Sequence, residues 1–261
     1  KYEFKAGVLY ECVVEHYNIS GKIALQLGFV PELISNPKDL KAIKEADCIV
    51  VCLGHDRVTE KENSDRTFQL PDGQEEYLRE ILMYNRNVVV VLNAGGGVDM
   101  TSWLPDVKAV LMAWYPGQQG GTAISEIITG KVNPSGKLPI SIEKKLEDNP
   151  SSANYYENVD RVRSQKLNPY SRVEYREGIF MGYRGYEKNN IEPLFPFGYG
   201  LSYNAFEYSD IAVNGAGQEF TVTFKVKNTG KVAGAEVAQV YVTDDKCSVV
   251  RPVKELKGFE K

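Results

Sequence analysis

Residues 48–53 read Cys-Ile-Val-Val-Cys-Leu, an unbroken apolar run. Such runs are typical of strands that a parallel sheet buries on both faces, so we expect Cys48 and Cys52 to be buried thiols. A helix is predicted just before the run, because Pro37 can open it and apolar residues then recur at helical spacing. Those apolar residues are Leu40, Ile43 and Ala46.

The alternation of helix and strand continues after this run. A helix led by Pro71 and Asp72 is expected before a strand at residues 88–92, and a further strand at residues 109–113 precedes a helix that Gly130 ends. Strands that alternate with helices indicate βαβ units and a mostly parallel sheet. The predicted fold class is therefore α/β, a layered α/β sandwich over residues 31–204.

Both flanks of this region have a strand pattern instead. Residues 1–29 alternate apolar and polar around a turn at 18–21, which predicts a β-hairpin, expected to be the end of a larger β-domain over residues 1–30. After Phe206 the alternation returns at residues 220–226 and 237–242. We expect residues 205–261 to form an incomplete immunoglobulin-like sandwich, since a whole one takes about 100 residues.

Composition excludes several classes of function. The 261 residues carry 31 Lys and Arg against 35 Asp and Glu, so nothing favours nucleic acid or an anionic membrane as a partner. No apolar run approaches the roughly 18 residues of a membrane span. Four cysteines are too scattered for a disulfide framework, and neither histidine has zinc-ligand spacing, so no metal site or cofactor is expected.

The most polar loop follows the 48–53 run. Ligands of open α/β sheets bind at the carboxyl ends of strands, and residues 54–66 pack four acids and three bases into thirteen positions there. Composition alone leaves two interpretations. One is a solvated surface loop; the other is a carboxylic acid beside a substrate, with Asp65 and Arg66 supporting the loop. Gly95-Gly-Gly97 lacks the pattern of a phosphate-binding loop.

A family resemblance favours the second interpretation. Glu62-Asn-Ser-Asp-Arg66, with Leu70-Pro71, resembles the E-G-x-D-R…L-P stretch in the α/β sandwich domain of glycoside hydrolase family 3. The resemblance implies that Glu62 is the general acid/base, with Glu60 as the runner-up. Asn63 departs from the family, which usually has glycine there. His55 is a candidate for the leaving-group subsite, and a surface position is its alternative.

Further stretches extend the resemblance over nearly the whole chain. Residues 228–259 resemble the family's fibronectin type III-like tail. Residues 4–29 resemble the end of the β-domain named after anthrax protective antigen, which some family 3 enzymes carry as an insertion. We expect the tyrosine-rich run 175–203 to seal an interdomain surface. The stretches are Trp114–Gly121 with Asn133–Pro139, Tyr175–Arg184, Pro193–Tyr203 and Asn228–Phe259.

The resemblance implies a retaining, β-glucosidase-like hydrolase that acts on a β-linked oligosaccharide or glycoside. Its nucleophile would be an Asp on a preceding (β/α)8 barrel that is missing from this chain, so we expect the fragment alone to be inactive. Two alternatives stay open, a non-catalytic carbohydrate-binding or scaffold relative and an unrelated nucleotide-binding protein. The sequence leaves open the sugar, the oligomeric state and the compartment, whether periplasmic, secreted or cytoplasmic.

Overall fold

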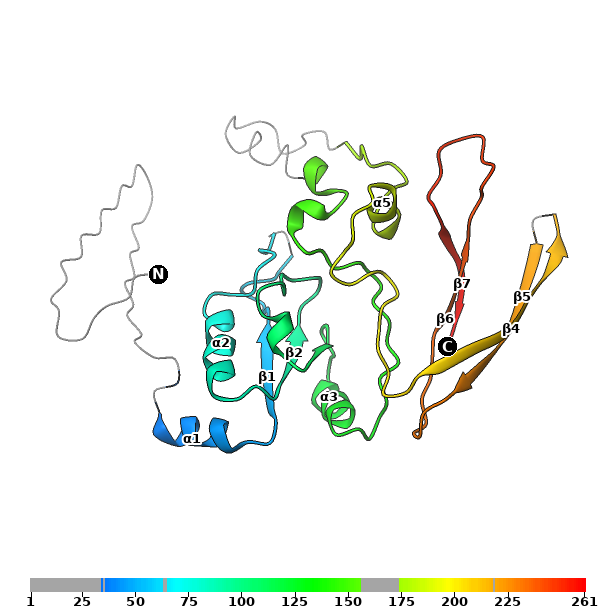
Figure 1. The fold of residues 1–261 in the computed structure, drawn as a ribbon. Coiled ribbons are helices and arrows are strands. Elements are labelled where there is room, and N and C mark those ends of the chain that lie inside the picture. Colours follow the sequence, from blue (N-terminus) through cyan, green and yellow to red (C-terminus); the bar gives the residue numbers. More distant parts are fainter. Residues whose placement is uncertain (1–33, 35, 63–64, 156–173, 218) are drawn as a thin grey trace, which may run out of the picture.

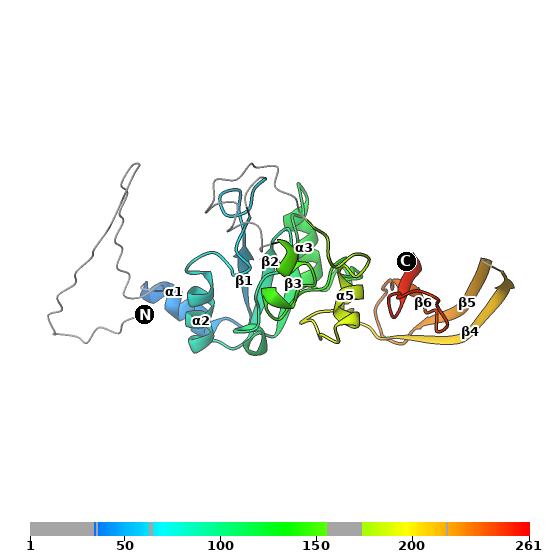
Figure 2. The ribbon, with the colours of Figure 1, turned by 90° about the horizontal axis from the view of Figure 1, so that it is seen from above.

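The computed structural model describes residues 34, 36–62, 65–155, 174–217 and 219–261. The predicted hairpin at residues 1–29 lies outside these ranges. Figures 1 and 2 show the described elements in a row, from the helices α1 and α2 through a small sheet to a separate group of strands near the C-terminus.

A three-stranded parallel sheet forms the centre of the first part. Strands β1 (Ile49–Gly54), β2 (Val88–Asn93) and β3 (Ala109–Met112) lie in the order β1-β2-β3 (Figure 2). Val51 is in register with Val90, and Val90 with Val110. This arrangement confirms the predicted α/β fold class.

Three helices connect and flank these strands: α1 (Pro37–Glu45), α2 (Gln74–Tyr84) and α3 (Gly120–Ile128). The predicted start of α1 is confirmed, and the Asn36 side chain caps it by accepting a hydrogen bond from the Lys38 N–H. Gly130, with φ of 75°, follows the end of α3 as predicted. Short 3-10 turns lie at Leu104–Asp106 and Leu146–Asp148, and α5 spans Tyr183–Lys188.

The apolar core lies around β2, the middle strand. The side chains of Val88, Val90 and Leu92 are fully enclosed, and Leu78 of α2 and Trp103 pack into the same core. Burying a large apolar side chain stabilises a fold by about 1.5–3 kcal/mol, so this core holds the carboxyl ends of the strands firmly.

Strand β1 corrects one prediction. Val51 and Leu53 are buried, but Val50 is 43% exposed, and the thiols of Cys48 and Cys52 are exposed rather than buried. The prediction assumed that elements cover both faces of the strand. Within the described part of the chain, β1 is an edge strand that is packed on one face only.

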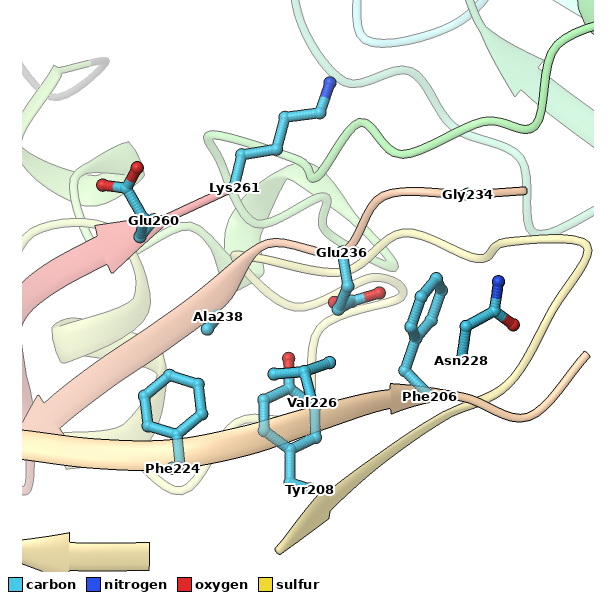
Figure 3. A pocket seen from close by; sticks show the side chains of 10 residues that line it. All are labelled: Phe206, Tyr208, Phe224, Val226, Asn228, Gly234, Glu236, Ala238, Glu260 and Lys261. Carbon is cyan, nitrogen blue, oxygen red and sulfur yellow. The ribbon is translucent and has the colours of Figure 1, made fainter.

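The second part contains two antiparallel strand pairs. Strand β4 (Phe206–Ala216) pairs with β5 (Glu219–Asn228), and β6 (Ala238–Val242) pairs with β7 (Glu255–Glu260). A hollow of about 360 Å³ separates the two pairs, with aromatic and aliphatic side chains on the β4–β5 side (Figure 3). This layout agrees with the predicted β-sandwich.

Polar contacts join the two parts. Lys137 forms an ion pair with Glu236 at 2.9 Å and donates to the Gly200 carbonyl oxygen at 2.7 Å. Tyr183 packs against Tyr241 and accepts a hydrogen bond from the Leu256 N–H at 2.9 Å. Tyr183 thus contacts both strands of the last pair, but Tyr175, Tyr199 and Tyr203 are exposed, so the sealing role of the whole run stays a prediction.

Candidate active site at the carboxyl ends of the strands

The three parallel strands end at one edge of the sheet, and each continues into a segment that contributes to a single cluster. His55 follows β1, Gly95–Gly97 follow β2, and Trp114 and Tyr115 follow β3. Open α/β sheets bind their ligands at this edge. The polar loop 54–66 and its surroundings therefore lie where a site is expected.

The Glu60 carboxylate accepts three hydrogen bonds in this cluster. Its Oε1 accepts from Arg66 Nε at 3.1 Å, while its Oε2 accepts from the Gly95 N–H at 3.1 Å and from the Tyr115 hydroxyl at 2.5 Å. The side chains of Glu60 and Arg66 are 22% and 17% exposed. Glu60 is thus held from three directions in a partly buried position.

These contacts also determine the protonation of Glu60. Burial acts to raise its pKa, but the hydrogen bonds from Tyr115 and Gly95 and the positive charge of Arg66 outweigh burial, so the pKa lies below its ordinary value. A carboxylate that stays ionised to low pH is a poor proton donor near neutrality. Glu60, the predicted runner-up acid, has the contacts of an anchor.

Asp65 and Arg66, the predicted supports of the loop, both bind distant segments. Arg66 donates through Nη2 to the Gly97 carbonyl oxygen at 2.6 Å and through Nη1 to that of Thr67 at 3.0 Å. Asp65 accepts a hydrogen bond from the Tyr155 hydroxyl at 2.8 Å. Arg66 therefore links the loop to the segment after β2, and Asp65 links it to a much later part of the chain.

Glu62, the predicted acid/base, lies in the sequence between Glu60 on one side and Asp65 and Arg66 on the other. Its side chain is exposed, in contrast to the clamped Glu60 two residues earlier. Asp56 begins the loop as a turn, since its Oδ1 accepts from the N–H groups of Val58 and Thr59, both at 2.9 Å. Three of the loop's four acids, Asp56, Glu60 and Asp65, thus accept hydrogen bonds within the protein, and Glu62 is exposed to solvent.

His55 is buried, with 6% of its surface exposed, so the surface alternative is wrong. Among the described residues, neither imidazole nitrogen has a hydrogen-bond partner. Burial and the nearby charge of Arg66 lower the pKa of His55 against the opposite pull of Glu60 and Asp56. The ring is therefore neutral near pH 7. Its place in a leaving-group subsite stays a prediction.

Sequence reasoning missed Tyr115 and the roles of the three glycines. Trp114, the residue before Tyr115, has a backbone φ of 53°, which is uncommon outside glycine. Its carbonyl oxygen accepts from Asn93 Nδ2 at 3.1 Å, which ties the end of β3 to the end of β2. The run Gly95–Gly97, which lacks a nucleotide-binding pattern, was the signal in the sequence that other side chains could pack closely against this segment.

In the ranges that the structure describes, no group of three or more His, Cys, Asp or Glu side chains is arranged to hold a metal ion. Among the same residues, no helix is both long and apolar enough to cross a membrane.

Residues 32–203 match the glycosyl hydrolase family 3 C-terminal domain. The chain belongs to glycosyl hydrolase family 3. Residues 236–261 match the fibronectin type III-like domain, in agreement with the predicted tail. Membership of this family replaces the alternative of an unrelated nucleotide-binding protein.

Curated relatives and solved structures agree with this family. The chain is 45% identical to thermostable β-glucosidase B of Acetivibrio thermocellus, over 90% of this chain and 30% of that protein. It is 36% identical to β-glucosidase BoGH3A of Bacteroides ovatus, over 100% and 35%. The crystal structure of the family 3 β-glucosidase of Bifidobacterium adolescentis superposes with a TM-score of 0.77 at 38% identity, over 85% of this chain and 32% of that one.

The chain spans about a third of the length of the curated relatives that it matches.

Proposed function

We propose that this chain is the C-terminal part of a retaining β-glucosidase-like hydrolase and that Glu62 is its general acid/base. The observation that carries the proposal is the contrast between two neighbouring acids of the loop 54–66. Glu60 is held by three hydrogen bonds, whereas Glu62, which matches the acid/base position of the family motif, is exposed at the ligand-binding edge of the sheet.

The proposed reaction needs two carboxyl groups about 5–5.5 Å apart. An Asp nucleophile on a (β/α)8 barrel outside this chain attacks the anomeric carbon while Glu62 protonates the departing oxygen. Glu62 then removes a proton from the water that hydrolyses the glycosyl-enzyme.

The proposed substrate is a β-linked glycoside or oligosaccharide, because the relatives are named as β-glucosidases. Since the nucleophile lies outside the chain, residues 1–261 alone are proposed to be inactive. The proposed division of the chain is the end of an inserted β-domain over residues 1–30, the α/β sandwich over 31–204 and part of a fibronectin type III-like domain over 205–261.

A leaving-group series tests the role of Glu62. In the complete protein, Glu62→Gln should lower kcat/KM strongly for aryl β-glucosides with poor leaving groups and little for those with good ones, because only the former need protonation. Glu219→Gln, an exposed substitution on β5, is the matched control. An equal loss for all substrates would contradict the proposal. A wild-type protein that binds the sugar without turnover would instead indicate a non-catalytic relative.

A further inference from the structure

We propose that Glu60, Arg66, Tyr115 and the Gly95–Gly97 segment form a positioning unit that sets where Glu62 stands relative to the substrate. The inference rests on the proposed acid/base role of Glu62. It assigns a role to side chains and glycines that take no direct part in the proposed hydrolysis.

The first support is the pattern of contacts on both sides of Glu62. Two residues before it, Glu60 binds the Gly95 N–H; four residues after it, Arg66 binds the Gly97 carbonyl oxygen. Both anchors therefore bind the same three-residue segment. They also bind each other, since Arg66 Nε lies 3.1 Å from Glu60 Oε1.

Glu60 and Arg66, one on each side of Glu62 in the sequence, are thus bound to each other and to residues 95–97. Residues 95–97 directly follow β2, the most deeply buried strand. The side chains of Glu60 and Arg66 are therefore bound to a segment that the rigid core holds in place. Tyr115 adds a third point from the end of β3, through its hydrogen bond to Glu60. Glu60, two residues before Glu62, and Arg66, four residues after it, are thereby held relative to the ends of two strands.

The second support is that the glycines leave room for these side chains. A Cβ atom on Gly95 would lie 2.7 Å from Glu60 Oε1, and one on Gly96 would lie 2.7 Å from Arg66 Nη2. A Cβ on Gly97 would meet Ile142 instead, at 3.1 Å. None of the three has a left-handed φ, so packing against the anchors, not backbone conformation, explains glycine at 95 and 96.

The clashes at Gly95 and Gly96 are with side-chain ends, which makes alanine variants informative. Gly96→Ala should fold and displace only the Arg66 guanidinium. Gly121→Ala is a matched control, because a Cβ there meets nothing within 4 Å. Tyr115→Phe removes one hydroxyl from the unit, and Tyr77→Phe, on the exposed side of α2, is its control.

The experiment measures kcat/KM of the complete protein over the same series of leaving groups. A displaced acid loses proton transfer, so Gly96→Ala, Glu60→Gln and Tyr115→Phe should each lose on the order of 10–100-fold with poor leaving groups and far less with good ones. The two controls should match the wild type. A merely structural role would lower kcat/KM equally across the series, and that result would overturn the inference.

A double variant separates this inference from the function on which it rests. If Glu60 acts through Glu62, adding Glu60→Gln to Glu62→Gln should cause little further loss. If the proposed function fails, Glu62→Gln alone already lacks a dependence on the leaving group. If only the inference fails, Glu62→Gln shows that dependence, but Glu60→Gln lowers kcat/KM by the same factor in both backgrounds.

Discussion

The Tyr115 hydroxyl donates a hydrogen bond to Glu60 at 2.5 Å, although the two residues stand 55 positions apart in the sequence. The contact joins the end of the third strand to the loop that follows the first. It helps to anchor Glu60, whereas Glu62, two residues later, is exposed.

The depressed pKa of Glu60 gives the cluster a definite pH dependence. Because the folded pKa lies below the ordinary value of 4.5, the ionised carboxylate stabilises the fold above about that pH, and this stabilisation is lost as the pH falls through the folded pKa. Glu60→Gln should therefore lower the free energy of unfolding at pH 7 and make it fall less steeply below pH 4.5. Urea unfolding at pH 7, 5 and 3.5 measures this. Parallel pH curves for variant and wild type would contradict it.

His55 should have a lower pKa than a surface histidine. Burial disfavours its charged form, so the unfolded chain takes up a proton near pH 6.5 and the folded protein only at lower pH. The protein should therefore lose stability as the pH falls below about 6.5. Imidazole resonances followed by NMR should give His55 a pKa below 6.5, and His55→Leu should weaken the loss of stability between pH 7 and 5. A His55 pKa at or above 6.5 would rule out this account.

Strand β1 should respond very differently to truncation on its two faces. Leu53 is 5% exposed and packs in the core, so Leu53→Ala should cost about 2–5 kcal/mol. Val50 lies on the opposite face and is 43% exposed, so Val50→Ala should lower the free energy of unfolding by less than about 1 kcal/mol. Chemical denaturation of residues 1–261 compares the two. Similar losses would mean that Val50 is covered in solution.

The ion pair of Lys137 and Glu236 should hold the C-terminal strands against the α/β part. Both side chains are largely buried, at 17% and 16% exposure, and Lys137 also binds the Gly200 carbonyl oxygen. Lys137→Ala leaves Glu236 without its partner and should cost about 1.5–3 kcal/mol. Limited proteolysis should then cut near residues 230–236 faster than in Lys38→Ala, an exposed control. Equal cleavage rates would show that other contacts suffice.

Much of the fold could be predicted from local patterns. The run at residues 48–53, the start of α1 at Pro37 and the end of α3 at Gly130 each depend on a few neighbouring residues. The exposure of Cys52 could not be predicted, because it depends on what packs on the far face of β1. A sequence window contains no information about that packing.

The site was predicted less completely. The family motif indicates Glu62 and Arg66, but the partners of Glu60 come from residues 35 and 55 positions away. Only the folded sheet brings the ends of three strands together. The burial of His55 was missed for the same reason, since its position after an apolar strand is equally compatible with a surface loop.

The stereochemistry of azide capture tests the role of Glu62 most directly. In the complete protein, Glu62→Ala should accumulate a glycosyl-enzyme from an activated aryl β-glucoside, because no base activates the water. Added azide should then restore turnover and yield the β-glucosyl azide, with retained configuration. An α-glucosyl azide would make this residue the nucleophile instead, and unchanged turnover without azide would contradict any catalytic role for Glu62.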